Sequence, residues 1–301
     1  MDPRSWEGWS GPRLLEHFAP EPAAAFAVLC STVPVSGTMA ASVRHICADT
    51  LGIPGLSGAL APWDAGVPPA IDPAVEAMAR QFATDVSAVD DLMRERFTRA
   101  CGGSMFEAAQ TIFIADLAPR VMVALDALAG AGGRWSDTAP VEVDGATFWS
   151  SIEGFLRVVY RMDALDPVLS EVVRLHGARQ HNCRLCQSIR SRPALVAGAD
   201  EELFDAIDGK GWTGLPARAR TALALTDAMI WHPGSLPDVL MADVRRDFRP
   251  AEAVEIVLDV MRNAANKIAV ALAADAPHVS SGIEVYEIDL DGVAHYGLAA
   301  L

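Results

Sequence analysis

The pattern of apolar and polar residues follows the period of an α-helix along most of the chain. The clearest case is residues 168–179, where apolar residues line one face directly after Asp166 and Pro167. Aspartate followed by proline is typical of a helix N-cap and its first helical position, so a helix is predicted to begin here. The same reasoning predicts further helices over residues 183–191, 217–231, 237–247 and 251–275.

Strand signals are few. Residues 141–148 and 283–298 alternate apolar and polar side chains around Asp-Gly pairs, which favours short β-hairpins. Residues 128–140 are rich in glycine and form the clearest linker. The sequence therefore predicts an all-α fold, a helical bundle with a short β-hairpin arm at its C-terminal end.

The two halves of the chain resemble one another when the sequence is shifted by about 146 residues. Any two amphipathic helices look somewhat alike, but the order and spacing of the similar segments hold across both halves. The matched segments are 35–46 with 181–192, 89–97 with 237–248, and 106–128 with 251–275. We therefore predict two copies of one helical unit, residues 1–135 and 136–281, followed by a C-terminal arm over residues 282–301.

Composition narrows the classes of function. The formal net charge is −15, so no basic surface for nucleic acid is expected, and an anionic membrane would repel the protein. The first residues are polar and resemble no signal peptide, while the apolar segment 251–275 carries charges such as Glu255, Asp259 and Lys267. The chain has only five cysteines, which fits a reducing compartment. A cytoplasmic protein that binds neither nucleic acid nor membrane is expected.

Cys183 and Cys186 form a Cys-x-x-Cys pair at the start of a predicted helix, after Asn182 as its N-cap. A helix N-terminus lowers the pKa of a cysteine, and Arg184 and Arg190 add positive charge that favours the thiolate. On a continuous helix Arg190 would share the face of both cysteines. The polar surroundings favour an accessible dithiol that exchanges with a disulfide or attacks a peroxide.

Two other interpretations of the pair stay open. A metal site would need four ligands, and although His176 and His181 are near, the chain has no second Cys-x-x-Cys pair, so no metal is expected. Buried cysteine also serves as a small apolar core residue, which is how we interpret the remaining cysteines. Those three are Cys30, Cys47 and Cys101.

Glu171 stands twelve positions before Cys183. The pattern Glu-x11-Cys-x-x-Cys, followed by "LPARARTALALTDAM" and a long helix with asparagines, resembles the AhpD-like family, also called the carboxymuconolactone decarboxylase family. The resemblance covers residues 150–275, and residues 20–130 as a degenerate copy in which Gly37 and Ala40 replace the cysteines.

The resemblance implies an all-α homo-oligomer that reduces a hydroperoxide or a disulfide through Cys183 and Cys186, with Cys186 as the attacking thiol. It implies no cofactor beyond the dithiol, and recycling by a dithiol reductant, in some members a lipoylated protein. Glu171 would take part in proton relay.

The sequence departs from the family pattern at Arg190, where the redox branch has a histidine. Arginine does not deprotonate in proteins, so it can hold a thiolate by charge but cannot act as a base. Glu171 would then act as the base directly, or His181 or His176 would take over the relay. The plainer interpretation of Glu171 is a helical carboxylate paired with Arg174 or Arg179.

Two further functions compete with a thiol oxidoreductase. One is a non-redox enzyme of the same fold, like the decarboxylase branch, in which Arg190 anchors an anionic substrate. The other is a non-catalytic helical oligomer with a vestigial Cys-x-x-Cys pair. Asn263 and Asn266, in the last helix, are interpreted as hydrogen-bonding a neighbouring loop rather than lining a pocket.

Overall fold

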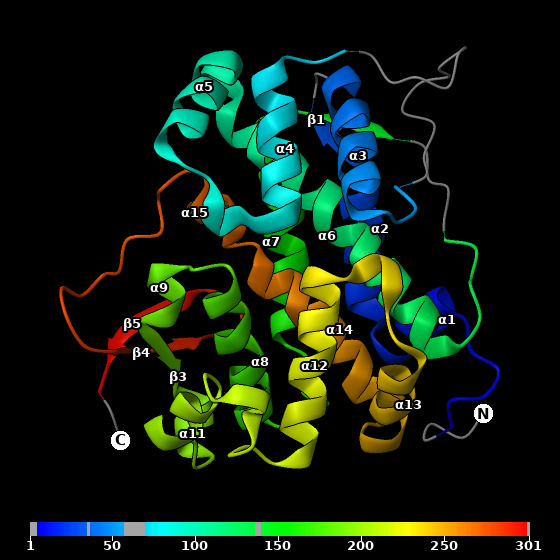
Figure 1. Cartoon of the computed structure of the whole chain (residues 1–301), viewed down its shortest axis with the longest axis vertical. Coiled ribbons are helices and arrows are strands. Elements are labelled where there is room, and N and C mark those ends of the chain that lie inside the picture. Colours follow the sequence, from blue (N-terminus) through cyan, green and yellow to red (C-terminus); the bar gives the residue numbers. More distant parts are fainter. Residues whose placement is uncertain (1–4, 35–36, 57–69, 136–139, 300–301) are drawn as a thin grey trace.

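The computed structural model describes residues 5–34, 37–56, 70–135 and 140–299. The fold is all-α with a small β arm at the C-terminal end, as predicted (Figure 1). The first half contains α1 (Gly11–Phe18), α2 (Pro20–Ser31), β1 (Thr32–Pro34), α3 (Gly37–Leu51), α4 (Pro73–Asp85), η1 (Val86–Ala88), α5 (Asp91–Cys101), η2 (Gly102–Ser104) and α6 (Met105–Ala129).

The second half begins with β2 (Val141–Val143), α7 (Gly145–Tyr160), α8 (Pro167–Gln180), α9 (Arg184–Gln187), β3 (Ile189–Ser191), α10 (Arg192–Val196), α11 (Glu201–Ala206) and η3 (Lys210–Trp212). It continues with α12 (Ala217–Trp231), η4 (Pro233–Ser235), α13 (Asp238–Asp247), α14 (Pro250–Ala264), α15 (Lys267–Ala271), β4 (Glu284–Ile288) and β5 (Ala294–Leu298). In the part of the chain that is described, no helix is both long and apolar enough to cross a membrane.

Local signals set several of these boundaries. The carboxylate of Asp166 accepts a hydrogen bond from the backbone N–H of Leu169 at 2.9 Å, and Pro167 opens α8, as predicted. The predicted helix over 251–275 is wrong in extent, because it breaks into α14 and α15 around Asn266. Asparagine competes with the helix through local hydrogen bonds, which makes this a favourable place for a break.

The predicted hairpin over 141–148 is also wrong, and the predicted C-terminal hairpin is confirmed. Only Val141–Val143 is extended, and it pairs in parallel with β1, while the carboxylate of Asp144 caps α7. At the C-terminal end β4 and β5 form an antiparallel hairpin. This arm joins the body of the protein through parallel pairing of β4 with β3.

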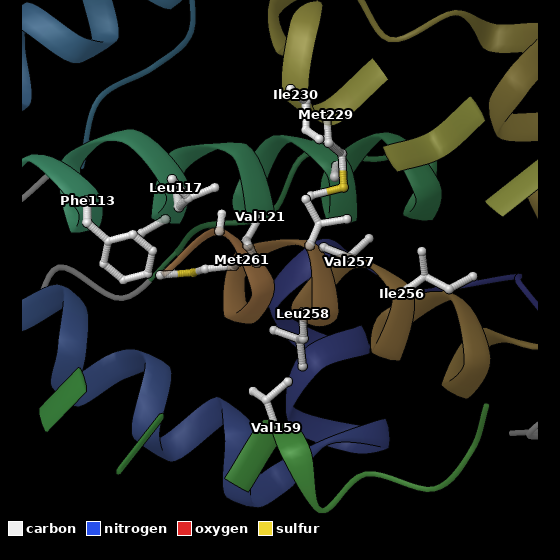
Figure 2. Close-up of a cluster of buried hydrophobic side chains, with 14 of the residues drawn as sticks. Phe113, Leu117, Val121, Val159, Met229, Ile230, Ile256, Val257, Leu258 and Met261 are labelled. Atoms are coloured by element: carbon white, nitrogen blue, oxygen red, sulfur yellow. The ribbon is translucent and has the colours of Figure 1, made fainter. Parts of the chain in front are cut away.

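Helix α14 lies in the middle of the bundle and is buried on nearly all sides (Figure 1). Figure 2 shows Val257 and Met261 of α14 meeting side chains of α6 and α12, such as Met229, while Leu258 points toward Val159 of α7. A helix is buried on nearly all sides only where other elements surround it. The described residues of both predicted units share this one hydrophobic core.

The order of elements recurs along the chain. Helix α2 begins at residue 20 and α8 at 167, α4 at 73 and α12 at 217, η1 at 86 and η4 at 233, α5 at 91 and α13 at 238, and α6 at 105 and α14 at 250. These displacements lie close to the shift of about 146 residues found in the sequence. The recurrence supports the predicted duplication, with the two units packed into one body.

The buried guanidinium of Arg120 forms hydrogen bonds near the C-terminal ends of two helices, α4 in the first predicted unit and α12 in the second. Its Nη2 donates to the carbonyl of Ala83 at 2.6 Å near the end of α4. Its Nη1 donates to the carbonyls of Met229 and Ile230, at 2.8 and 2.6 Å, near the end of α12. Asp116 accepts from the same guanidinium at 2.6 Å and from Lys267 of α15 at 2.5 Å. Arg120 thereby satisfies carbonyls that the ends of both helices leave open.

We predict that Arg120→Met lowers the free energy of unfolding by about 3–5 kcal/mol, because it leaves buried carbonyls unsatisfied and breaks a buried ion pair. Urea unfolding measures the change. Arg99→Met is the matched control, since the Arg99–Glu95 ion pair is exposed and should contribute less than about 1 kcal/mol. Equal losses in the two variants would contradict the role given to Arg120.

Candidate functional site

The Cys-x-x-Cys segment forms a tight turn rather than a long helix. Helix α8 ends at Gln180, and Asn182 then takes a left-handed conformation with φ of 51°, which asparagine tolerates better than most residues. Cys183 follows as the N-cap of α9, so the prediction of Asn182 as N-cap is wrong. Cys183 and Cys186 are joined by a disulfide with Cα atoms 5.3 Å apart.

Both sulfurs are buried, contrary to the expectation of an accessible pair. Cys183 is 1% and Cys186 4% exposed, and they pack against Ala178, Leu185 and Val270. The backbone N–H of Cys186 donates to Sγ of Cys183 at 3.3 Å. Burial disfavours a thiolate, whereas this N–H donor favours one on Cys183.

Cys186 lines a pocket of about 320 Å³, and Cys183 does not. Helices α7, α8 and α14, the Cys-x-x-Cys turn and the C-terminal arm all contribute walls. The chain has only three tyrosines, and all of them line this pocket: Tyr160, Tyr286 and Tyr296. The polar lining also includes Arg157, Arg174, Arg262, Asn263 and Asn266. The two asparagines therefore line the pocket, contrary to the structural interpretation given to them from the sequence.

Glu171 and Arg174 form a buried ion pair behind the disulfide. The carboxylate of Glu171 accepts from Nε and Nη2 of Arg174 at 2.6 and 2.7 Å, and from the backbone N–H of Ser191 at 3.0 Å. Arg174 in turn donates to the carbonyls of Cys186 and Ile189, at 2.8 and 2.9 Å. Burial lowers the pKa of Arg174, but Glu171, together with Tyr286 and Tyr296, raises the pKa by more, so the cation persists.

This geometry matches the plainer interpretation of Glu171, a carboxylate paired with Arg174. Its oxygens are occupied by three donors, which suits a positioning residue better than a free base. Through Arg174 it fixes the backbone on both sides of the end of α9. Of the predicted site residues, Cys183, Cys186 and Glu171 are therefore brought together.

The two predicted thiolate-stabilising arginines lie elsewhere. Arg190 binds the carboxylate of Glu201 with two hydrogen bonds of 3.0 Å and stacks on Phe204, and it does not line the pocket. The premise that it shares a helical face with the cysteines is wrong, because α9 ends at Gln187 and residue 190 is in a strand. Arg184 pairs with Asp275 at 2.7 Å. Carboxylates thus offset both charges.

The two histidines proposed for proton relay also lie outside the pocket lining. His176 Nε2 is 2.6 Å from the carboxylate of Asp227. Burial, with Lys267 and Arg120 nearby, lowers the pKa of His181 well below its usual value and keeps it neutral. Among the described residues, no group of three or more histidine, cysteine, aspartate or glutamate side chains is placed to hold a metal ion.

A second hollow, of about 270 Å³, lies behind the first and shares four walls with it: Tyr160, Arg174, Arg262 and Tyr286. Its far side contains Glu255 and Asp259. Burial and the neighbouring Asp259 raise the pKa of Glu255 to about 8, and burial also raises the pKa of Asp259. Glu255 therefore holds a proton at neutral pH, one layer of side chains away from the disulfide pocket.

Several residues of this site escaped prediction from the sequence. Glu255, Asp259 and Arg262 are spaced to share one face of the predicted helix, but the hollows that this face meets became apparent only in the folded chain. The tyrosines carried a usable signal. Two of only three in the chain fall in the predicted C-terminal hairpin, which marks that arm as a candidate pocket wall.

The raised pKa of Glu255 predicts how stability depends on pH. A carboxyl whose pKa rises from 4.5 to about 8 on folding stabilises the protein below pH 4.5, and this contribution is lost as pH rises toward 8. Because of Glu255, the unfolding free energy of the wild type should fall over this range with a slope approaching about 1 kcal/mol per pH unit. We predict that Glu255→Gln removes this part of the fall. Urea unfolding between pH 5 and pH 8 measures it.

The matched control is Glu202→Gln at an exposed position. Parallel stability curves for wild type and Glu255→Gln across this pH range would contradict a proton held on Glu255.

Comparison with known proteins finds two relatives in Mycobacterium tuberculosis. They are the uncharacterized protein MT2376 of strain CDC 1551 and the uncharacterized protein Rv2313c of strain H37Rv. Each is 42% identical to this chain over 280 residues, covering 89% of this chain and 96% of the relative. No family model matches the chain, and no solved structure matches it.

Proposed function

The chain belongs to the family of these two mycobacterial proteins, and we propose that it is a thiol oxidoreductase of the alkylhydroperoxidase type, similar to the AhpD-like family. It would reduce a hydroperoxide or a disulfide through Cys183 and Cys186. The disulfide itself supports this function best. Of its two cysteines Cys186 lines the pocket, which is large enough for a small organic substrate, and Cys183 does not.

The reaction begins with the reduced pair. The thiolate of Cys186 attacks one oxygen of a hydroperoxide ROOH, so that an S–O bond forms and the O–O bond breaks. The leaving alkoxide takes a proton and departs as ROH, and Cys186 becomes a sulfenic acid. The thiol of Cys183 attacks this sulfur, which forms the disulfide and releases water. An external dithiol, such as a lipoylated protein, then returns two electrons and two protons.

The surrounding residues fit separate parts of this cycle. Arg174 lines the pocket with Cys186 and donates to the Cys186 carbonyl, so it holds the attacking residue in position. Glu171 positions Arg174, and the N–H donor at Cys183 stabilises that sulfur when an external thiol attacks Cys186. We further propose that the protein is cytoplasmic and forms a homo-oligomer.

One observation favours a second candidate. The burial of both sulfurs suits a non-redox enzyme of the same fold, which would bind a carbonyl or lactone substrate in this pocket and keep the disulfide as a structural link. The two candidates differ in one property: a structural disulfide does not cycle with substrate.

We predict that Cys186→Ser abolishes the reaction of the reduced protein with cumene hydroperoxide. Cys183→Ser should react once and stop at a sulfenic acid on Cys186, because the resolving thiol is missing. Stopped-flow measurement of peroxide consumption and dimedone labelling of the sulfenic acid distinguish the two variants.

Cys101→Ser is the matched control, since Cys101 lies outside the pocket and is a free thiol. It should react like the wild type. Unchanged peroxide consumption in Cys186→Ser would contradict the proposed function and favour the non-redox candidate.

A further inference from the structure

Two neighbouring hydrogen-bond donors in the disulfide pocket lack an acceptor. Nε of Arg262 and Nδ2 of Asn263 are buried and make no hydrogen bond. Within the described ranges, only the side chain of Gln110 shares this condition, and it does not line the pocket. Buried donors are almost always satisfied in folded proteins, so two adjacent exceptions on residues that line one pocket point to an absent acceptor.

The guanidinium of Arg262 is held in place, although its Nε donates no hydrogen bond. Its Nε lies 3.2 Å from Oδ1 of Asp259, an ion-pair distance, but the geometry gives no hydrogen bond. Its face lies over the ring of Tyr160, with the central carbon 5.1 Å from the ring centre. The side chain is only 13% exposed. The aromatic ring therefore fixes the orientation of a cation whose Nε has no hydrogen-bond acceptor.

The charged residues of the pocket lining are mainly arginines. The lining holds three arginines, of which Arg174 is paired with Glu171 and Arg262 lies beside Asp259, and one carboxylate, that of Glu153, which is exposed. The remaining walls are mostly apolar or aromatic, and they include Trp149, Leu156 and Ile288. Such a lining suits a ligand with an apolar body and one anionic end.

We propose that Arg262 and Asn263 form a carboxylate-binding subsite, so that the pocket takes apolar organic acids. The two oxygens of a carboxylate match two neighbouring N–H donors, and an arginine supplies the charge. The apolar body would lie along the aromatic walls beside Cys186. As a statement about substrate, this inference rests on the proposed function and names its class: hydroperoxides of fatty or aromatic acids. As a statement about binding, it does not require redox activity.

Binding is tested with octanoate and octanamide, which differ in charge at one end only. Isothermal titration of the native disulfide form should show octanoate binding about tenfold or more tightly than octanamide. Arg262→Gln and Asn263→Ala should each weaken octanoate binding by about tenfold, and Arg262→Lys should retain part of it. Thermal unfolding of each variant verifies that it is folded, and Asn263→Ala serves if Arg262→Gln is not.

Arg99→Gln is the matched control. Arg99 is an exposed arginine outside the disulfide pocket, so its loss should change octanoate binding by less than about threefold. Equal affinity for octanoate and octanamide would overturn the subsite. Unchanged octanoate binding in folded Arg262→Gln and Asn263→Ala would also overturn it.

A second measurement separates this inference from the proposed function. The reduced protein is mixed with linoleic acid hydroperoxide or with its methyl ester, and oxidation of the Cys183–Cys186 pair is followed. The free acid should react faster in the wild type, and Asn263→Ala should reduce that preference. If octanoate binds but neither peroxide oxidises the pair, the proposed function fails and the subsite stands. If both peroxides react equally and octanoate does not bind, the subsite fails and the function stands.

Discussion

The buried ion pair between Glu171 and Arg174 is the interaction on which the site depends. It ties helix α8 to the carbonyls of Cys186 and Ile189 and to the N–H of Ser191, so it fixes the turn that carries the disulfide and the strand that follows. That strand pairs with β4, which brings the C-terminal arm and Tyr286 over the pocket. In Figure 1 the arm lies beside α9. Removing either charge would leave the other buried and unpaired, which is costly.

A second buried charge explains how one half of the chain supports the other. Arg120 caps equivalent ends of α4 and α12, and Asp116 connects it to Lys267, which follows the asparagines of the pocket. The first half of the chain, which lacks the cysteine pair, thus helps to hold α12 and α15 of the second half in place. In the proposed duplication, one copy retained the dithiol and the other became its structural partner. This division accounts for a core that is continuous across both copies.

The sequence predicted what local chemistry decides, and failed where distant contacts decide. The start of α8 and the terminal hairpin were predictable because capping residues and alternation act over a few positions. The short length of α9 could not be predicted. Strand β3 pairs with β4, almost a hundred residues away, and this pairing extends the backbone at residues 189–191. Because the backbone is extended there, the side chain of Arg190 lies beside Glu201 and not beside the cysteines. The pocket combines segments from residue 149 to residue 296, so Cys186 is the one residue of its lining that the sequence identified as a site residue.

In the proposed reaction the Cys183–Cys186 disulfide forms and breaks with each turnover. The most direct measurement is the number of titratable thiols in the reduced native protein before and after one equivalent of an alkyl hydroperoxide, with peptide mass analysis to locate any new disulfide. The account predicts that two thiols disappear and that the peptides containing Cys183 and Cys186 become linked. An unchanged number of thiols in protein whose pair had been reduced would contradict it.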